Sequence, residues 1–307
     1  MSRRLYHILF IAVLLTIAYY FNFHELIFER PQSVHAWRQS DCASMALNYY
    51  QNGMNFFKPE VHNLTSDSGS TGYTATSEIP VLYYFVAILY KIFGFHEWIY
   101  RLLVCLIFLT GLYYLFKTFT QVSHDFFWSI SLPLIFFGSP LLVYYGISFL
   151  SNIPAFSFTL IAWYHFFKYK RSGPNQSLVF SLIFFLLAGA LKITALLSFI
   201  ALVLVFILEY SKLVKFRQEK RIFRSPVLFA VSSFAIILII FSWILYAKYY
   251  NSLHDTTYFS TTVFPLWNLK HDVIIATINN VKNIWLPQYF HTSNYILLSI
   301  SIVFILL

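Results

Sequence analysis

Several side chains capable of acid–base and phosphate chemistry occupy one polar segment, residues 24–78, between the first two apolar runs of the chain. They are Arg38, Asp41, Glu60, His62 and Glu78. Because only 11% of the residues are charged and 59% are hydrophobic, this grouping suggests chemistry at a membrane surface. A carboxylate there can accept the proton of an attacking hydroxyl, and a nearby cation can stabilise a departing phosphate.

Asp41 is the candidate general base. Apolar residues at helical spacing predict a helix that runs to about Asn52, with Ser40 as its cap. Asp41 then lies in the first turn, where the helix dipole favours the ionised carboxylate. An acid at a helix start can also act only as a capping charge, so both interpretations stay open.

Lys192 and Arg38 are the candidate phosphate ligands. Lys192 lies among apolar residues, where a lysine either extends to the membrane surface or pairs with an anion such as phosphate. The planar guanidinium of Arg38 suits bidentate contact with phosphate. A salt bridge from Arg38 to Asp41 or Glu78 is the alternative. Such a bridge would not exclude a role for Arg38, since it could hold the acid in position.

Four further polar residues are weaker candidates. Glu78 precedes Pro80 and can bind the donor or serve as a first-turn charge, while Asn152 can bind a sugar hydroxyl or cap a helix. Glu60 and His62 are candidate sugar or metal contacts. Their spacing matches no metal-ligand pattern, so no metal site and no required cofactor are predicted, and a divalent metal requirement stays open.

The composition indicates an integral membrane protein. The 307 residues have a mean hydropathy of +0.65. The net charge of +9 does not indicate nucleic acid, because the cations do not form one stripe. They concentrate in two linkers between apolar runs, which is typical of cytoplasmic loops. These linkers contain Lys168, Lys170 and Arg171, and Lys212, Lys215, Arg217, Lys220, Arg221 and Arg224.

A count of crossings predicts the topology. The apolar runs are 5–23, 79–94, 98–117, 126–146, 152–168, 177–208, 226–247 and 295–307. Both basic linkers lie on the side of Arg3 and Arg4 only if 79–94 does not cross and 177–208 is a hairpin. We therefore expect 79–94 to be an interfacial helix, and we expect 177–208 to turn at residues 189–192.

In this topology the N-terminus is cytoplasmic, and the loops 24–97 and 248–293 are extracytoplasmic. Arg101 then begins a span at the outer interface, where an anchoring role is expected. The whole chain, residues 1–307, is expected to form one transmembrane domain. The run 295–307 is shorter than the roughly 20 residues of a full span, so the chain looks truncated at its C-terminus.

Four stretches carry a family resemblance: Trp37-Arg38-Gln39-Ser40-Asp41, Asn55-Phe56-Phe57-Lys58-Pro59, Glu78-Ile79-Pro80 and Gly94-Phe95-His96-Glu97-Trp98. They resemble the dolichyl-phosphate-mannose-type glycosyltransferases of the GT-C class, in particular a bacterial branch with a Trp-Arg-Gln-x-Asp motif. The likeness covers about residues 30–200. It implies an all-α polytopic fold, a catalytic acid in the first outer loop, and a sugar donor linked to polyprenyl phosphate.

The sequence departs from the wider class at three positions. Arg38 and Gln39 stand where relatives often have adjacent acids. Asn152 stands where the branch usually has an acid, and His62 stands near another such position.

We expect a glycosyltransferase in a bacterial inner membrane, with a glycan, lipid or protein as acceptor and no nucleic-acid partner. A transporter or flippase for lipid-linked saccharides is the main alternative, and an inactive scaffold is another. The absence of two related halves disfavours the transporter.

Overall fold

The structure is a computed structural model that describes residues 3–64, 71–123, 125–211, 221–259, 266–289 and 291–306. Within these ranges the chain is helical and has no strand, and an isolated bridge pairs Glu60 with Tyr73. The predicted all-α polytopic fold is therefore confirmed. Helices suit a membrane because they satisfy their own backbone hydrogen bonds where no water is present.

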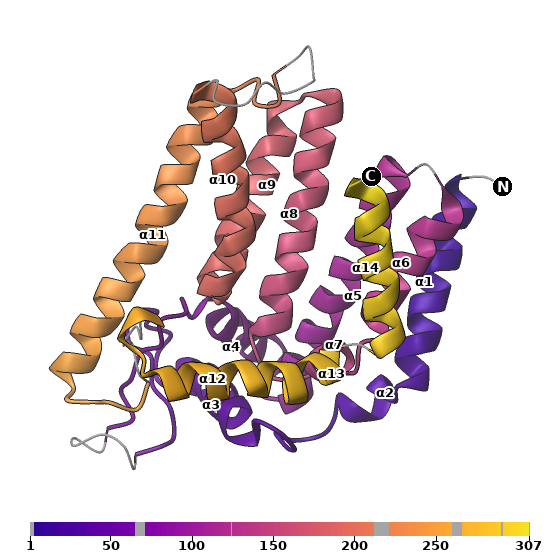
Figure 1. The fold of residues 1–307 in the computed structure, drawn as a ribbon. Helices are drawn as coiled ribbons and strands as arrows, with labels where there is room; N and C mark the ends of the chain where they lie inside the picture. Colours follow the sequence, from indigo (N-terminus) through magenta and orange to yellow (C-terminus); the bar gives the residue numbers. More distant parts are fainter. Residues whose placement is uncertain are drawn as a thin grey trace.

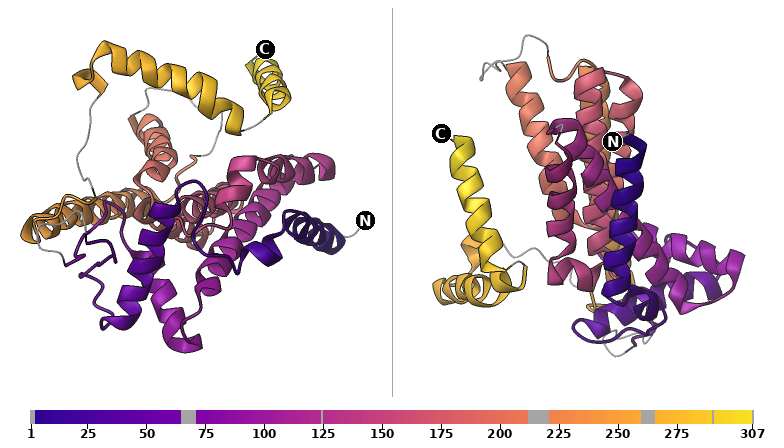
Figure 2. Two further views of the ribbon diagram at one scale, coloured as in Figure 1. Left: turned by 90° about the horizontal axis from the view of Figure 1, so that it is seen from below. Right: turned by 90° about the vertical axis from the view of Figure 1, so that its right-hand side faces the viewer.

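The long helices run along one direction; all but the last form a bundle (Figure 1), and the last stands apart from it (Figure 2). They are α1 (Arg3–Tyr20), α5 (Glu97–Val122), α6 (Phe126–Phe137), α8 (Asn152–Ser172), α9 (Asn175–Leu191), α10 (Leu196–Ser211), α11 (Pro226–Leu253) and α14 (Thr292–Leu306). In the described part of the chain, three segments are long and apolar enough to cross a membrane: Glu97–Val122, Ile193–Ser211 and Pro226–Leu253. Shorter apolar helices, α1, α6 and α9 among them, accompany these three.

The short elements gather at the lower end of the bundle in Figure 1. They are α2 (Phe23–Leu26), α3 (Ala36–Gln51), α4 (Val81–Phe93), α7 (Pro140–Tyr145), η1 (Ile193–Ala195), η2 (Leu266–Asn268), α12 (His271–Asn280), the π-helical η3 (Val281–Trp285) and α13 (Leu286–Tyr289). The predicted non-crossing run 79–94 is helix α4, which packs beside α3 at this end. Figure 2 shows α12 as an arm that lies across the bundle axis.

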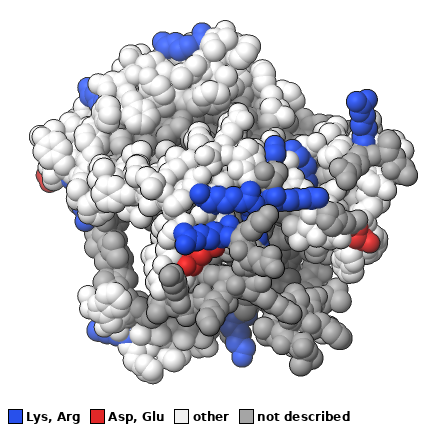
Figure 3. All heavy atoms as spheres, turned by 90° about the horizontal axis from the view of Figure 1, so that it is seen from above, with Lys and Arg blue, Asp and Glu red and all other residues white. Residues whose placement is uncertain are grey.

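The basic linkers lie at the opposite end of the bundle. The α8–α9 connection, the end of α10 and the start of α11 are there, together with the start of α1. Figure 3 shows this end with many Lys and Arg side chains and few acidic ones. Lys212, Lys215, Arg217 and Lys220 lie outside the described residues. The arrangement matches the predicted separation between the basic linkers and the loop that carries Asp41.

Two predicted runs differ in detail from the structure. The run 126–146 is not one helix, because it is divided into α6 and α7 at Gly138, Ser139 and Pro140, where the proline begins the next helix. The run 177–208 is a hairpin as predicted, but residues 189–191 still belong to α9, and the turn begins at Lys192.

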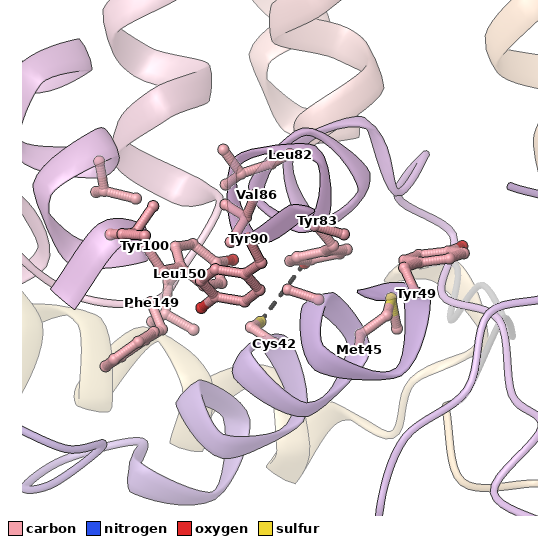
Figure 4. Close-up of a cluster of buried hydrophobic side chains, with 14 of the residues drawn as sticks. Cys42, Met45, Tyr49, Leu82, Tyr83, Val86, Tyr90, Tyr100, Phe149 and Leu150 are labelled. Atoms are coloured by element: carbon pink, nitrogen blue, oxygen red, sulfur yellow. Dashed lines mark hydrogen bonds between the residues drawn. The ribbon is translucent and has the colours of Figure 1, made fainter. Parts of the chain in front are cut away.

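A shared core fixes α3 against α4 (Figure 4). Cys42, Met45 and Tyr49 of α3 pack against Leu82, Tyr83, Val86 and Tyr90 of α4, with Tyr100, Phe149 and Leu150 beside them. The thiol of Cys42 lies 3.5 Å from the hydroxyl of Tyr83. Because these side chains are almost fully buried, they hold the polar face of α3 in one orientation.

Candidate functional site

The start of helix α3 differs from the prediction. The helix begins at Ala36, preceded by His35 in the left-handed conformation with φ 61°, so Ser40 is not the cap. The Ser40 hydroxyl instead donates to the carbonyl of Ala36 at 2.9 Å. Asp41 therefore lies in the second helical turn, where the dipole of the helix contributes little to its ionisation. Its partners must come from elsewhere in the fold.

Asp41 lies at the wall of a cavity of about 510 Å³. Trp37, Ser44, His62 and Asn63 also line this cavity, and Asp41 is only 7% exposed. The pKa of the Asp41 carboxyl group is raised above its ordinary value, because the effect of burial exceeds the opposing effects of the Tyr258 hydroxyl and the Arg38 charge. The carboxylate is thus held next to a space that a ligand can enter.

Glu78 is the centre of a buried charged network. Its Oε1 lies 2.5 Å from Nζ of Lys192, and its Oε2 lies 3.3 Å from Nη2 of Arg38. The hydroxyls of Ser151 and Tyr83 donate to Oε2 at 3.0 and 3.3 Å. Of the two alternative salt bridges considered for Arg38, the one to Glu78 is present. A buried carboxylate with two cations and two hydroxyl donors is a fully satisfied anion.

Lys192 also lines a second cavity, of about 440 Å³, between α8 and the η1–α10 turn. Asn152, Phe156, Thr159 and Leu197 contribute to its walls. Leu197 is 70% exposed, so the rim of this cavity is apolar. The turn is set by close packing, because a Cβ at Gly189 would meet side-chain atoms of Leu196 at 2.5 Å. An ammonium group therefore stands beside an opening with an apolar surface around it.

Arg38 lies between Asp41 and the charged network of Glu78. It precedes Asp41 by three residues on the same face of α3, and it reaches the network of Glu78 and Lys192. Burial opposes the charge of Arg38, but nearby Tyr83, Cys42, Glu78 and Asp41 raise the pKa of the guanidinium group. Phe259 covers the guanidinium, whose central carbon lies 4.6 Å from the ring centroid.

The weaker candidates Asn152, His62 and Glu60 lie in three different cavities. Asn152 is the first residue of α8 and lies in the Lys192 cavity. His62 lies in the Asp41 cavity, with Nε2 2.8 Å from Oδ1 of Asn48. Glu60 lies in a separate cavity, where Asn52 donates to its carboxylate at 2.9 Å. Among the described residues, no cluster of three His, Cys, Asp or Glu side chains is close enough to hold a metal ion.

Arg101 has a structural role inside the protein, and not the expected anchoring role at the membrane interface. It is 4% exposed and donates to the carbonyls of Leu26, Arg30 and Ile147 at 3.0, 2.7 and 3.2 Å. Its guanidinium also lies over the ring of Phe149. Arg101 therefore fastens the first loop to α5 and to the segment that precedes α8.

Tyr258 is the site residue that the sequence did not reveal. Its hydroxyl lies 2.9 Å from both carboxylate oxygens of Asp41. The only signal for Tyr258 was its position directly after a long apolar helix, where the chain returns to the end of the bundle that holds α3.

The helical bundle and its buried charged network belong to a membrane glycosyltransferase of the GT-C type. Residues 77–246 match the model of the dolichyl-phosphate-mannose-protein mannosyltransferase family, and since this is more than half of the chain, the chain belongs to that family. The family uses a polyprenyl-phosphate-linked sugar. Neither a curated protein nor a solved structure matches the chain.

The family match includes part of the site. Glu78, Asn152 and Lys192 lie inside the matched residues, whereas Arg38, Asp41 and Tyr258 lie outside them. The roles of the latter three must therefore be argued from geometry. Membership of an enzyme family favours the glycosyltransferase over the transporter.

Proposed function

We propose that this protein transfers a monosaccharide from a polyprenyl-phosphate carrier to an acceptor hydroxyl on the extracytoplasmic face of a bacterial inner membrane. The acceptor is a glycan, a lipid or a protein. One observation carries the proposal: the ion pairs from Arg38 through Glu78 to Lys192 run from the face of α3 that carries Asp41 to the cavity that has an apolar rim.

The two cavities suit the two substrates. A polyprenyl chain requires an apolar surface, and its phosphate requires a cation, as the Lys192 cavity provides. Asn152 in the same cavity can donate to the phosphate or to a sugar hydroxyl. The acceptor enters the Asp41 cavity, where Trp37 and His62 supply an aromatic face and a polar group.

The proposed reaction is an in-line displacement with inversion at the anomeric carbon. Asp41 accepts the proton of the acceptor hydroxyl as its oxygen forms a bond to the anomeric carbon. The bond from that carbon to the phosphate oxygen breaks, and its electron pair stays on the phosphate, which remains on the lipid. Lys192 and Arg38 stabilise the charge that develops there. Glu78 holds both cations in position.

Replacing Asp41 tests the proposal. In purified protein with a labelled polyprenyl-phosphate-mannose donor, Asp41→Asn should lower the rate of sugar transfer about 10³-fold, as expected for the loss of a general base. Asp125→Asn is the matched control, because Asp125 caps α6 through the backbone of Trp128 and asparagine is an equally good cap. An Asp41→Asn variant with the parent rate would remove Asp41 from the mechanism.

A further inference from the structure

Tyr258 makes a saturated set of hydrogen bonds in front of Asp41. The indole nitrogen of Trp37 and the amide nitrogen of Asn63, the latter at 3.1 Å, both donate to its hydroxyl oxygen. A hydroxyl accepts two hydrogen bonds and donates one, and neither an indole nor an amide nitrogen can accept. The proton of Tyr258 must therefore point toward Asp41, whose two oxygens are each 2.9 Å away.

The hydrogen bond from Tyr258 favours the ionised form of Asp41. A donor bonds more strongly to a carboxylate than to a neutral carboxyl group, so the Tyr258 hydroxyl opposes the effect of burial. Tyr258 itself stays a donor, since burial raises the pKa of its hydroxyl above the ordinary value. A carboxylate also has about four acceptor sites, so the bond from Tyr258 leaves others for an acceptor hydroxyl.

The neighbouring residue acts on the cation beside Asp41. Phe259 lies over the guanidinium of Arg38, so two successive residues contact the carboxylate and the guanidinium on the same face of α3. Tyr258 and Phe259 follow α11, whose last residue is Leu253, and they lie beyond the family match that ends at residue 246. A segment more than 200 residues away in the chain thus completes the wall of the site.

We propose that Tyr258 is a positioning residue that orients the Asp41 carboxylate toward the acceptor and keeps it ionised. The inference rests on the proposed function, since it assumes that Asp41 is the base. The other titratable groups that face this region are Arg38 on the same helix, His62 across the cavity, and Glu78 beyond Arg38. Of these, Arg38 also favours the ionised acid, so removing the hydroxyl leaves one stabilising partner.

Tyr258→Phe is the test, because it removes the hydroxyl and keeps the ring that stacks on Trp37. The loss of a donor to a charged group raises the pKa of Asp41, so the base becomes protonated at a higher pH. The acid limb of the pH–rate profile for sugar release from polyprenyl-phosphate mannose should shift upward. At a pH on the acid limb, the rate of the variant should be about tenfold lower than that of the parent. At a pH well above the limb, the two rates should be similar.

Tyr250→Phe is the matched control. Its hydroxyl donates to the carbonyl of Pro59 at 3.2 Å, so it also ties α11 to the first loop, without contact to Asp41. The control should lower thermal stability to a similar extent and leave the acid limb in place. If both variants lose stability and neither changes the pH profile, Tyr258 is only a structural tie and the inference is wrong.

A titration without turnover separates this inference from the proposed function. Infrared difference spectra of parent and Asp41→Asn protein isolate the carboxylate band of Asp41, which can then be followed with pH. An upward shift of its midpoint in Tyr258→Phe supports the inference even if the parent transfers no sugar, an outcome that would refute the function alone. An unchanged midpoint overturns the inference even in an active enzyme.

Discussion

Glu78 and Lys192, 114 residues apart in the chain, form an ion pair of 2.5 Å at the end of the bundle that carries the first loop. The second oxygen of Glu78 contacts Arg38, so a single carboxylate holds two cations. Breaking a buried ion pair from one side costs about 3–5 kcal/mol, because a charge is left without a partner. The network is therefore rigid, which suits cations that must meet a phosphate.

Lys192→Gln should lower sugar transfer about 10²–10³-fold, because the variant loses the cation nearest the apolar-rimmed cavity. Lys192→Arg should recover part of the rate, since the charge returns with a different shape. The measurement is the initial rate with labelled polyprenyl-phosphate mannose. Lys91→Gln, in α4, removes an exposed lysine outside the network and should behave as the parent. A fully active Lys192→Gln protein would exclude the proposed phosphate contact.

Glu78→Gln should bind the product polyprenyl phosphate more tightly and turn over more slowly. For a phosphate about 5 Å from the Glu78 carboxylate, the repulsion is about 3 kcal/mol at an effective dielectric constant of 20. This repulsion exceeds the binding free energy that is lost when Lys192 is held less firmly. Product inhibition should therefore strengthen about tenfold or more, while the rate falls because Lys192 and Arg38 lose their common partner. Glu60→Gln, in a separate cavity, is the control. Weaker product inhibition in Glu78→Gln would contradict this account.

Arg101→Met should lower the free energy of unfolding by about 3 kcal/mol, because three backbone carbonyls lose a charged donor in a buried place. The thermal midpoint of the purified protein in detergent measures the effect. Arg30→Met removes a cation of the same loop whose side chain is 85% exposed, and it should change the midpoint little. Equal midpoints for the two variants would show that Arg101 is not a fastening point.

Introduced cysteines should reveal which end of the bundle faces the outside. The native Cys42 and Cys105 are buried, and burial raises the pKa of the Cys42 thiol to about 11, so neither is a useful probe. Gln51→Cys, at the exposed end of α3, should react with a membrane-impermeant maleimide in intact cells. Gln176→Cys, exposed at the start of α9, should react only after permeabilisation. The reverse pattern would invert the proposed orientation.

The course of the chain through the bundle could be predicted from local sequence. Apolar runs and basic linkers carry the information. A chain in lipid must satisfy its backbone hydrogen bonds within its own helices, and basic loops stay on one face of the membrane. The count of crossings predicted a helix that does not cross, and the structure places this helix, α4, beside α3 at one end of the bundle; the count also predicted the hairpin of α9 and α10. The break between α6 and α7 was missed, although Gly138 and Pro140 were visible signals.

The site was only partly predictable. The sequence named Arg38, Asp41, Glu78 and Lys192 as chemically useful, and their residue types alone suggested the roles. The start of α3 was misplaced by about one turn, because a left-handed His35 without a side-chain cap leaves little trace in the sequence. That error assigned the ionisation of Asp41 to the helix dipole instead of to Tyr258 and Arg38.

Sequence by itself determined the class of fold, the end of the bundle that carries the polar loop, and the kinds of side chain available there. Tertiary structure alone decided that Glu78 joins Arg38 to Lys192 and that Tyr258 meets Asp41 across 217 positions. The physical reason is that hydropathy and helical spacing act over a few turns of chain. Contacts between distant segments depend instead on how whole helices pack, which in this protein is set by the buried core between α3 and α4 and by the close approach at Gly189.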